Sequence, residues 1–238
     1  MFVDNPTWIE ETFDKKLKDV DLGAVDRCQV VLEFVSELIH ASRISRMSFI
    51  DWGGGYGLLT RMARDRGLNF KNFDPYVDSL FAGPANLPTL EPCQLILAGE
   101  VFLHLENPLQ TLLELLKYAP IIVITAVVPP KNLQSDWWYL MKSTGQHIAF
   151  FPEKSLEKMA LLAGVHLTSD SQFFHVFSKE KLNFSSRLVV NYRGIAFLRS
   201  YLRVGARNLM RALGRSKSLT EGDQTELIES RDEIERAE

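Results

Sequence analysis

A glycine-rich turn, residues 53–57, separates a short apolar segment from a helical one and largely determines which fold this sequence can adopt. The apolar segment before it, residues 46–52, reads as a strand, and residues 58–66 carry helix formers. A second strand follows at residues 68–73 and ends at Asp74. Strand, glycine turn, helix and strand in this order predict a βαβ unit, the building block of a parallel sheet.

The same alternation continues along the chain. Residues 121–128 are almost wholly apolar and rich in β-branched side chains, which is typical of a central parallel strand buried on both faces. Further strands are expected at residues 90–98, 165–167 and 173–178, and helices at residues 24–41, 108–118 and 155–163. The sequence therefore predicts an α/β fold of the Rossmann-like kind with a mainly parallel central sheet.

Composition agrees with a folded domain. The chain has 238 residues, of which 46% are hydrophobic and 24% charged, and this length can bury a large core without disulfides. Two cysteines, Cys28 and Cys93, exclude a disulfide scaffold and a cysteine-rich zinc module. The first residues lack the features of a signal peptide, and the longest apolar run, residues 119–130, is too short to span a bilayer. We therefore expect a cytoplasmic protein.

Charge is distributed unevenly, although the net charge is only −3. Residues 183–217 contain eight basic residues and no acidic one, whereas residues 218–238 contain eight acidic residues and two arginines. We therefore expect a domain over residues 1–182, of which residues 1–45 form a helical cap, followed by a basic helical appendage and an acidic, disordered tail.

The basic appendage has the pattern of an amphipathic helix. Arginine recurs at every fourth position, and apolar side chains gather on the opposite side. Three interpretations stay open: peripheral contact of Arg193–Lys217 with the inner face of the cell membrane, binding of substrate phosphates, or packing on the domain with a solvated basic face. Nucleic acid is not expected as a partner, because the rest of the chain is acidic.

The glycine turn also has features of a nucleoside-binding loop. Gly53, Gly55 and Gly57 let a ligand approach the main chain. Asp74, at the end of the next strand, can accept hydrogen bonds from ribose hydroxyls. The spacing differs from the G-x-G-x-x-G of dinucleotide folds, and Asp51 would repel a pyrophosphate. Both features favour S-adenosylmethionine, which carries an amine and a sulfonium, over NAD; a nicotinamide-dependent oxidoreductase is the weaker alternative.

In this region the sequence resembles the class I S-adenosylmethionine-dependent methyltransferases. Residues 51–57 are similar to the first motif of that family, Asp74 to its ribose-binding acid, and residues 99–108 to the segment after its fourth strand. Residues 136–139 and 144–151 resemble a bacterial subgroup associated with sugars and cell-surface polysaccharide. The resemblance implies a Rossmann-like methyltransferase fold and S-adenosylmethionine as the cofactor.

The resemblance further places Glu100 near the cofactor, with a helix cap as the alternative role. His104 follows four residues later, so on a helical turn it shares a face with Glu100 and is a candidate general base. A hydrogen-bonded structural histidine is the alternative. Leu103 departs from the family, which usually has Glu there, and this implies a different acceptor or a loss of activity.

A polar segment that ends at His147 is the best candidate for acid–base chemistry. The side chain of His147 titrates near neutral pH and follows the amide of Gln146. Trp137, Trp138 and Tyr139 are suited to stacking on a sugar ring, and Gln146 to binding the same acceptor. The alternatives are a loop-orienting histidine, and aromatic residues that pack as a lid or in the core. No metal is expected, since the sulfonium is a good leaving group and one base suffices.

Together these patterns predict methyl transfer from S-adenosylmethionine to a small acceptor. The expected acceptor is a sugar hydroxyl in the synthesis of surface polysaccharide or glycoconjugates. The alternative is a non-catalytic, membrane-associated scaffold that retains the nucleotide-binding fold, which would explain Leu103 and the basic appendage.

Overall fold

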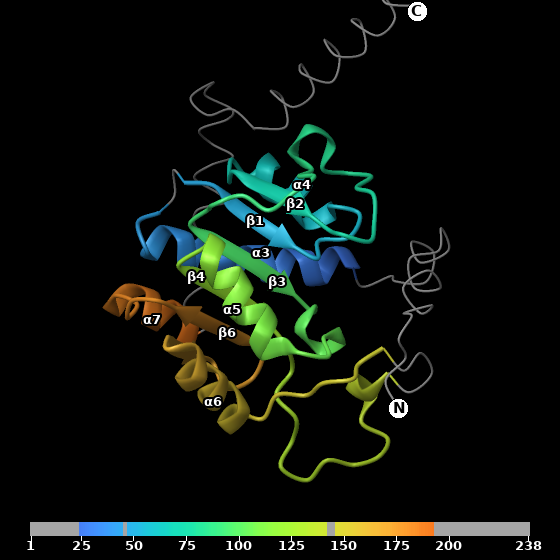
Figure 1. Ribbon diagram of the computed structural model, residues 1–238, viewed down its shortest axis with the longest axis vertical. Helices are drawn as coiled ribbons and strands as arrows, with labels where there is room; N and C mark the ends of the chain where they lie inside the picture. The colour runs from blue at the N-terminus through green and yellow to red at the C-terminus, as the bar shows by residue number, and fades with distance from the viewer. Residues whose placement is uncertain (1–23, 45–46, 142–145, 193–238) are drawn as a thin grey trace, which may run out of the picture.

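The computed structural model of the chain describes residues 24–44, 47–141 and 146–192, and a six-stranded sheet forms the centre of this part (Figure 1). The strands are β1 (Phe49–Trp52), β2 (Phe70–Phe73), β3 (Leu95–Gly99), β4 (Ile121–Thr125), β5 (His166–Ser169) and β6 (Phe174–Ser178). Their order across the sheet is β2-β1-β3-β4-β6-β5. The first four pair in parallel, and β6 runs antiparallel to both neighbours. The predicted α/β fold with a mainly parallel sheet is confirmed.

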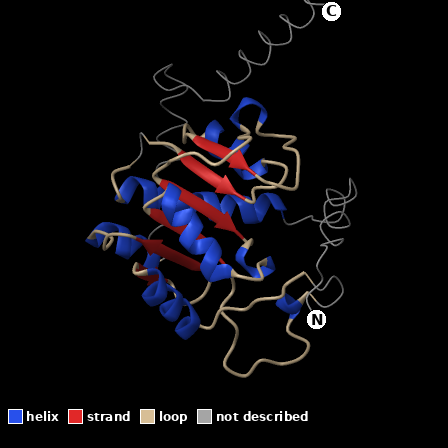
Figure 2. Cartoon of the chain, in the orientation of Figure 1, coloured by secondary structure: helices blue, strands red, loops and turns tan. Residues whose placement is uncertain are grey.

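Helices cover both faces of the sheet (Figure 1, Figure 2). One face packs against α3 (Ala24–Ala41), α4 (Leu58–Asp65) and α7 (Phe184–Asn191). The other packs against α5 (Pro108–Tyr118) and α6 (Glu153–Ala163). Short 3-10 helices lie in the connections: η1 (Gly83–Ala85), η2 (Phe102–His104) and η3 (Trp138–Leu140). No helix within the described ranges is both long and apolar enough to cross a membrane.

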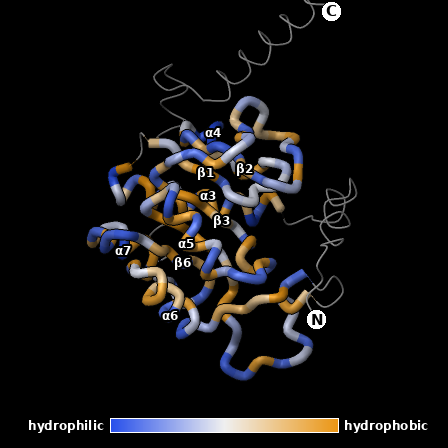
Figure 3. The backbone as a smooth tube through the Cα atoms, in the orientation of Figure 1, coloured by the Kyte–Doolittle hydropathy of each residue, from blue (hydrophilic) through white to orange (hydrophobic). Residues whose placement is uncertain are grey.

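The strands are apolar because they are buried on both sides. Leu95 and Leu97 of β3 belong to the apolar cluster under α3, whereas Ile96 and Ala98 belong to the cluster under α5. This alternation follows from the period of two along a strand. Since helices cover both faces, the central strands β3 and β4 are apolar at almost every position, and Figure 3 shows hydrophobic residues concentrated there.

Two strands are shorter in the structure than the sequence predicts. The strand expected at 121–128 ends at Thr125, although the N–H of Ala126 still donates to the carbonyl of Phe173. The strand expected at 90–98 begins only at Leu95. Apolar side chains continue past both ends because the connecting segments also pack on the core, so hydropathy alone overestimates strand length.

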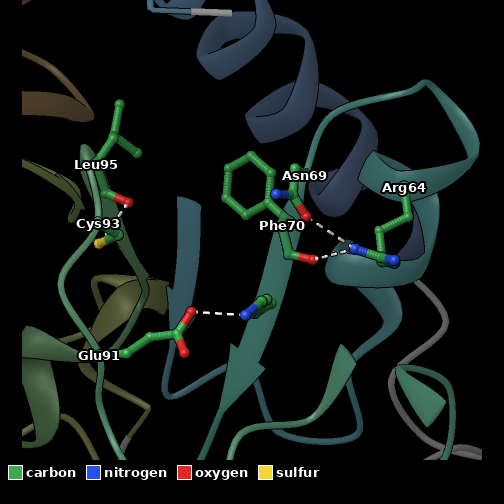
Figure 4. Close-up of polar contacts among 7 residues, drawn as sticks. Arg64, Asn69, Phe70, Glu91, Cys93 and Leu95 are labelled. Atoms are coloured by element: carbon green, nitrogen blue, oxygen red, sulfur yellow. Dashed lines mark hydrogen bonds and ion pairs between the residues drawn. The ribbon is translucent and has the colours of Figure 1, made fainter. Parts of the chain in front are cut away.

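One arginine of α4 hydrogen-bonds the chain at the start of β2. Arg64, in the last turn of α4, donates from Nη1 to Oδ1 of Asn69 over 3.2 Å and to the carbonyl of Phe70 over 3.1 Å (Figure 4). On the same strand, Lys71 forms an ion pair with Glu91 at 2.6 Å. These contacts tie the start of β2 to α4 and its middle to the segment before β3.

The domain extends beyond the boundary predicted at residue 182. Val189 and Val190 of α7 are fully buried against the α3 side of the core. Asn183 caps α7 by accepting the N–H of Ser186, and its amide donates to the carbonyl of Ala41 at the end of α3. The count of basic residues obscured this apolar face. Residues 24–41 of the predicted cap likewise belong to the main core, and residues 1–23 and 193–238 lie outside the described residues.

Candidate functional site

The connectivity of the sheet creates a place for a ligand between β1 and β3. From β1 the chain passes through α4 to β2 on one side, whereas from β3 it passes through α5 to β4 on the other. The carboxyl ends of both strands lie at the same edge (Figure 1). In open α/β sheets, ligands bind outside the carboxyl ends of the strands at such a switch point. The glycine turn follows β1 at this edge, and Glu100 follows β3.

The glycine turn requires its glycines. Gly53, Gly55 and Gly57 have φ angles of 69°, 54° and 79°, a region that strains other residues. Gly54 is required for space, because a Cβ there would lie 2.2 Å from Oδ1 of Asn72. The turn therefore presents bare main chain, with Gly57 as the N-cap of α4.

Asp51 lies directly against this turn and is 4% exposed. A Cβ on Gly54 would lie 2.6 Å from Oδ2 of Asp51, and Thr60 donates its hydroxyl to the same oxygen over 3.2 Å. Burial raises the pKa of Asp51 to about 7; the hydrogen bond from Thr60 lowers it, and the charge of Asp74 adds a smaller increase. The carboxyl group therefore changes charge near neutral pH, and a cation bound at the turn would favour the ionised form.

Asp74 joins the glycine turn to the segment after β2. Its Oδ2 accepts the N–H of Gly55 over 2.9 Å, and its Oδ1 accepts the N–H groups of Tyr76 and Val77 over 2.9 and 3.1 Å. A carboxylate oxygen can accept two hydrogen bonds, so Oδ2 retains capacity for a ligand. The structure thus brings the predicted ribose-binding acid to the turn, while its contact with ribose stays a prediction.

Glu100 is held by hydroxyl groups of the protein. Its φ of 58° is uncommon for a residue other than glycine. Thr125, at the end of β4, accepts the N–H of Glu100 over 2.9 Å and donates to Oε1 over 3.0 Å, while Tyr139 donates to Oε2 over 2.7 Å. Burial raises the pKa of Glu100, and these two hydroxyl bonds lower it. Glu100 therefore forms part of the framework of the site, and its predicted cofactor contact stays a prediction.

The two predicted catalytic histidines lie side by side. The ring centroids of His104 and His147 are 5.2 Å apart. Nδ1 of His147 lies 2.6 Å from the carbonyl of Tyr139, and Nδ1 of His104 lies 2.8 Å from the carbonyl of Gln146. Because a carbonyl only accepts, each Nδ1 carries the proton. Burial lowers the pKa of both histidines, so both are neutral at pH 7.

The three consecutive aromatic residues have different surroundings. Trp138 is 70% exposed, whereas Tyr139 is 3% exposed. Trp137 is half-buried, and its ring lies 5.3 Å from that of Tyr139 and 5.6 Å from that of Phe150. The stacking role predicted for Tyr139 is wrong for this structure, because protein covers its ring. Trp138 has an open face for stacking.

Several residues of the site were not anticipated from the sequence. Thr60, Asn72 and Thr125 are fully buried polar residues next to the turn or to Glu100. The available signal was a polar residue inside or beside an apolar segment, as at Thr125. Leu103 is fully buried in the core, and its carbonyl accepts the N–H groups of residues 148 and 149. Within the described part of the chain, no three His, Cys, Asp or Glu residues could hold a metal together.

Comparisons with known proteins agree with this arrangement. A family model described as a methyltransferase domain matches residues 26–169. No curated protein sequence matches the chain.

Solved structures similar to this chain include three with low sequence identity. Magnesium protoporphyrin IX methyltransferase (ChlM) from Synechocystis PCC 6803, with bound SAH, is 13% identical with a TM-score of 0.46; the match covers 69% of this chain and 86% of that one. TnmH is 15% identical with a TM-score of 0.48, covering 74% and 62%. An O-methyltransferase family 2 protein from Planctomyces limnophilus DSM 3776, in complex with apigenin, is 12% identical with a TM-score of 0.45, covering 58% and 51%. The chain thus spans about half of the Planctomyces protein and less than two thirds of TnmH.

Proposed function

Because this chain belongs to the methyltransferase domain family, we propose that it transfers the methyl group of S-adenosylmethionine to a hydroxyl group of a small acceptor. The observation that carries the proposal is the glycine turn at the switch point, flanked by the carboxyl groups of Asp51 and Asp74. These residues suit the cofactor, because bare main chain allows close approach and two carboxyl groups favour a ligand with a positive amine and sulfonium.

Each part of the site has a role in holding the cofactor. The main chain of Gly53–Gly57 would lie against it, Asp74 would accept its ribose hydroxyls, and Asp51 would supply negative charge under the turn. When bound, S-adenosylmethionine supplies an electrophilic methyl group on sulfur, so the protein needs only to orient the acceptor and receive one proton.

His147 is the proposed general base. Its Nδ1–H donates to the carbonyl of Tyr139, so the neutral ring has its lone pair on Nε2. Burial lowers the pKa of His147, which keeps the ring neutral at pH 7 and ready to accept a proton. Nε2 would receive the hydroxyl proton of the acceptor when the acceptor oxygen takes the methyl group, while the carbon–sulfur bond breaks and leaves a neutral thioether. His104, 5.2 Å away between ring centroids, supports the segment that carries His147.

A sugar hydroxyl in polysaccharide or glycoconjugate synthesis is the proposed acceptor. Trp138 supports this assignment, because its exposed indole, 5.2 Å from the ring of Tyr139 between centroids, offers a face on which a sugar ring can stack. The resemblance of residues 136–139 and 144–151 to sugar-associated methyltransferases points the same way. Trp137 and Gln146 would line the same acceptor position.

The first test is calorimetric titration of the full chain with S-adenosylmethionine, with NAD as the control ligand. We expect micromolar binding of S-adenosylmethionine and no binding of NAD; the reverse result would overturn the cofactor assignment. Nucleotide sugars then form the first acceptor screen. His147→Gln should retain cofactor binding and lose at least 100-fold in turnover. Full turnover by this variant would remove His147 as the base.

The segment Arg193–Lys217 supports a further part of the proposal, peripheral contact with an anionic membrane from the cytoplasmic side. This segment lies outside the described residues, so the support is its sequence alone: arginine at every fourth position opposite apolar side chains. Sedimentation with vesicles that contain anionic lipid tests it. Replacing Arg203, Arg207 and Arg211 by Gln in the full chain should weaken binding, and equal binding would exclude membrane contact through these arginines.

A further inference from the structure

Building on the proposed methyl transfer, we propose that Tyr139 is a positioning residue. Its hydroxyl contacts Glu100 and its carbonyl contacts His147, and together they hold the imidazole in the tautomer and orientation that a base requires.

Three hydrogen bonds of Tyr139 join segments that are distant in the sequence. Its hydroxyl donates to Oε2 of Glu100 over 2.7 Å, at the end of β3, and accepts the N–H of Val127 over 3.0 Å, after β4. Its carbonyl accepts Nδ1–H of His147 over 2.6 Å. Because one residue makes all three bonds, a displacement of Tyr139 would move the imidazole relative to the carboxyl edge of the sheet.

Burial makes the loss of these hydrogen bonds costly. Tyr139 is 3% exposed, and its ring centroid lies 4.7 Å from that of His147. A hydroxyl that donates to a buried carboxylate forms a charge-assisted bond, and removing it leaves a buried acceptor with one partner fewer. The N–H of Val127 would lose its acceptor in the same change. Both penalties favour the observed position of Tyr139.

The conformation of Glu100 provides an anchor for this arrangement. Its φ of 58° persists in a residue other than glycine only where the surroundings over-determine it. Thr125 binds both the N–H and Oε1 of Glu100, which fixes the residue to the end of β4. The hydroxyl of Tyr139 therefore connects the segment that contains Tyr139 and His147 to Glu100, which Thr125 already holds at the end of β4.

A second connection reaches the residue before His147 without touching its imidazole. The Nδ1 of His104 donates to the carbonyl of Gln146 over 2.8 Å, and the same ring lies close to the backbone of Glu100. Glu100 is thus linked to the main chain at Gln146 through His104 and to the ring of His147 through Tyr139. The orientation of the ring depends on the second of these links.

Nuclear magnetic resonance of the histidine rings in the ¹⁵N-labelled full chain tests this proposal. The chain has five histidines, and His147→Gln identifies the signals of His147. In the wild type we expect the Nδ1–H form of His147. Tyr139→Phe should raise the Nε2–H form at least threefold, whereas Tyr118→Phe, a matched change in a half-buried tyrosine of α5, should leave it unchanged. The hydroxyl of Tyr118 makes no hydrogen bond within the described ranges.

A second variant covers the case in which Tyr139→Phe does not fold. Glu100→Gly removes the acceptor of the same bond, and glycine adopts a φ of 58° without strain. We expect it to shift His147 in the same direction as Tyr139→Phe. A wild-type tautomer ratio in either folded variant would overturn the positioning role.

Calorimetry with S-adenosylmethionine on the same samples separates this proposal from the one it builds on. A wild-type chain that binds no S-adenosylmethionine would overturn the proposed methyl transfer, while the spectra would still decide whether Tyr139 orients His147. Cofactor binding together with an unaltered His147 spectrum in either folded variant would overturn the role of Tyr139 alone.

Discussion

At the residue scale, Asp51 links stability to pH. Burial raises its pKa from an ordinary value of 3.8 to about 7 in the folded chain. Between these two values the folded state keeps a proton that the unfolded state has lost, so the free energy of unfolding falls as the pH rises through this window. Above pH 7 the loss reaches about 4 kcal/mol, since a pKa difference of 3 corresponds to roughly that amount.

Asp51→Asn should remove this loss. At pH 8 we expect the free energy of unfolding of the variant, measured with urea, to exceed that of the wild type by up to about 4 kcal/mol. At pH 4 we expect the two values to be nearly equal. Asp74→Asn is the control and should destabilise the chain, since Asp74 accepts three main-chain N–H groups. An equal effect of Asp51→Asn at both pH values would contradict the raised pKa.

Leu103, which departs from the family motif, has a packing role in the core. The side chain is fully buried among apolar neighbours. Leu103→Glu, which would restore the residue usual in the family, should destabilise the domain by about 3 kcal/mol or more, because it buries a carboxyl group without a partner. Leu103→Met should cost less than about 1.5 kcal/mol. Thermal unfolding of the two variants checks this, and a stable Leu103→Glu protein would show that the position is open to water.

At the scale of single elements, the two ends of α4 provide a matched pair of glycines. Gly57 and Gly67 both have a φ of 79°, but a Cβ on Gly57 would lie 2.6 Å from Oγ of Ser79, whereas a Cβ on Gly67 would meet nothing within 4 Å. Backbone strain should cost alanine about 1–2 kcal/mol at either position, and at Gly57 the clash with Ser79 and Ala82 adds to that cost. We expect only Gly57→Ala to weaken S-adenosylmethionine binding, by at least tenfold in calorimetry. Equal binding by both variants would mean that the turn does not contact the cofactor.

The elements around the site were predictable to different degrees. The glycine turn and Asp74 could be recognised because local spacing encodes a strand, a tight turn and the end of the next strand. The difference in exposure between Trp138 and Tyr139 could not be predicted, because adjacent aromatic residues look equivalent in a sequence. Tyr139 is buried with its hydroxyl bonded to Glu100, a residue 39 positions earlier that only the fold brings within 2.7 Å.

At the scale of the whole molecule, apolar patterns predicted the layers of the fold but not its edges. The almost wholly apolar segment at residues 121–128 indicated a strand covered on both faces, and the two clusters of buried residues confirm this. The insertion of β6 between β4 and β5 depends on the pairing of β4 with β6, whose partners lie 49 to 57 residues apart and which periodicity does not report. The predicted end at residue 182 was misplaced because eight basic residues outweighed a short apolar stripe.

Truncation at two positions tests where the domain ends. A chain that stops at Leu182 loses Val189 and Val190, whose burial contributes about 3–6 kcal/mol together, a large share of the stability of an ordinary domain. It also exposes the side of α3 that α7 covers. We expect this chain to melt at a much lower temperature than the full chain or to remain unfolded in circular dichroism. A chain that stops at Tyr192 keeps α7 and should melt within a few degrees of the full chain. Equal melting of the two truncated chains would show that α7 is dispensable, and the domain would then end where the change in charge begins.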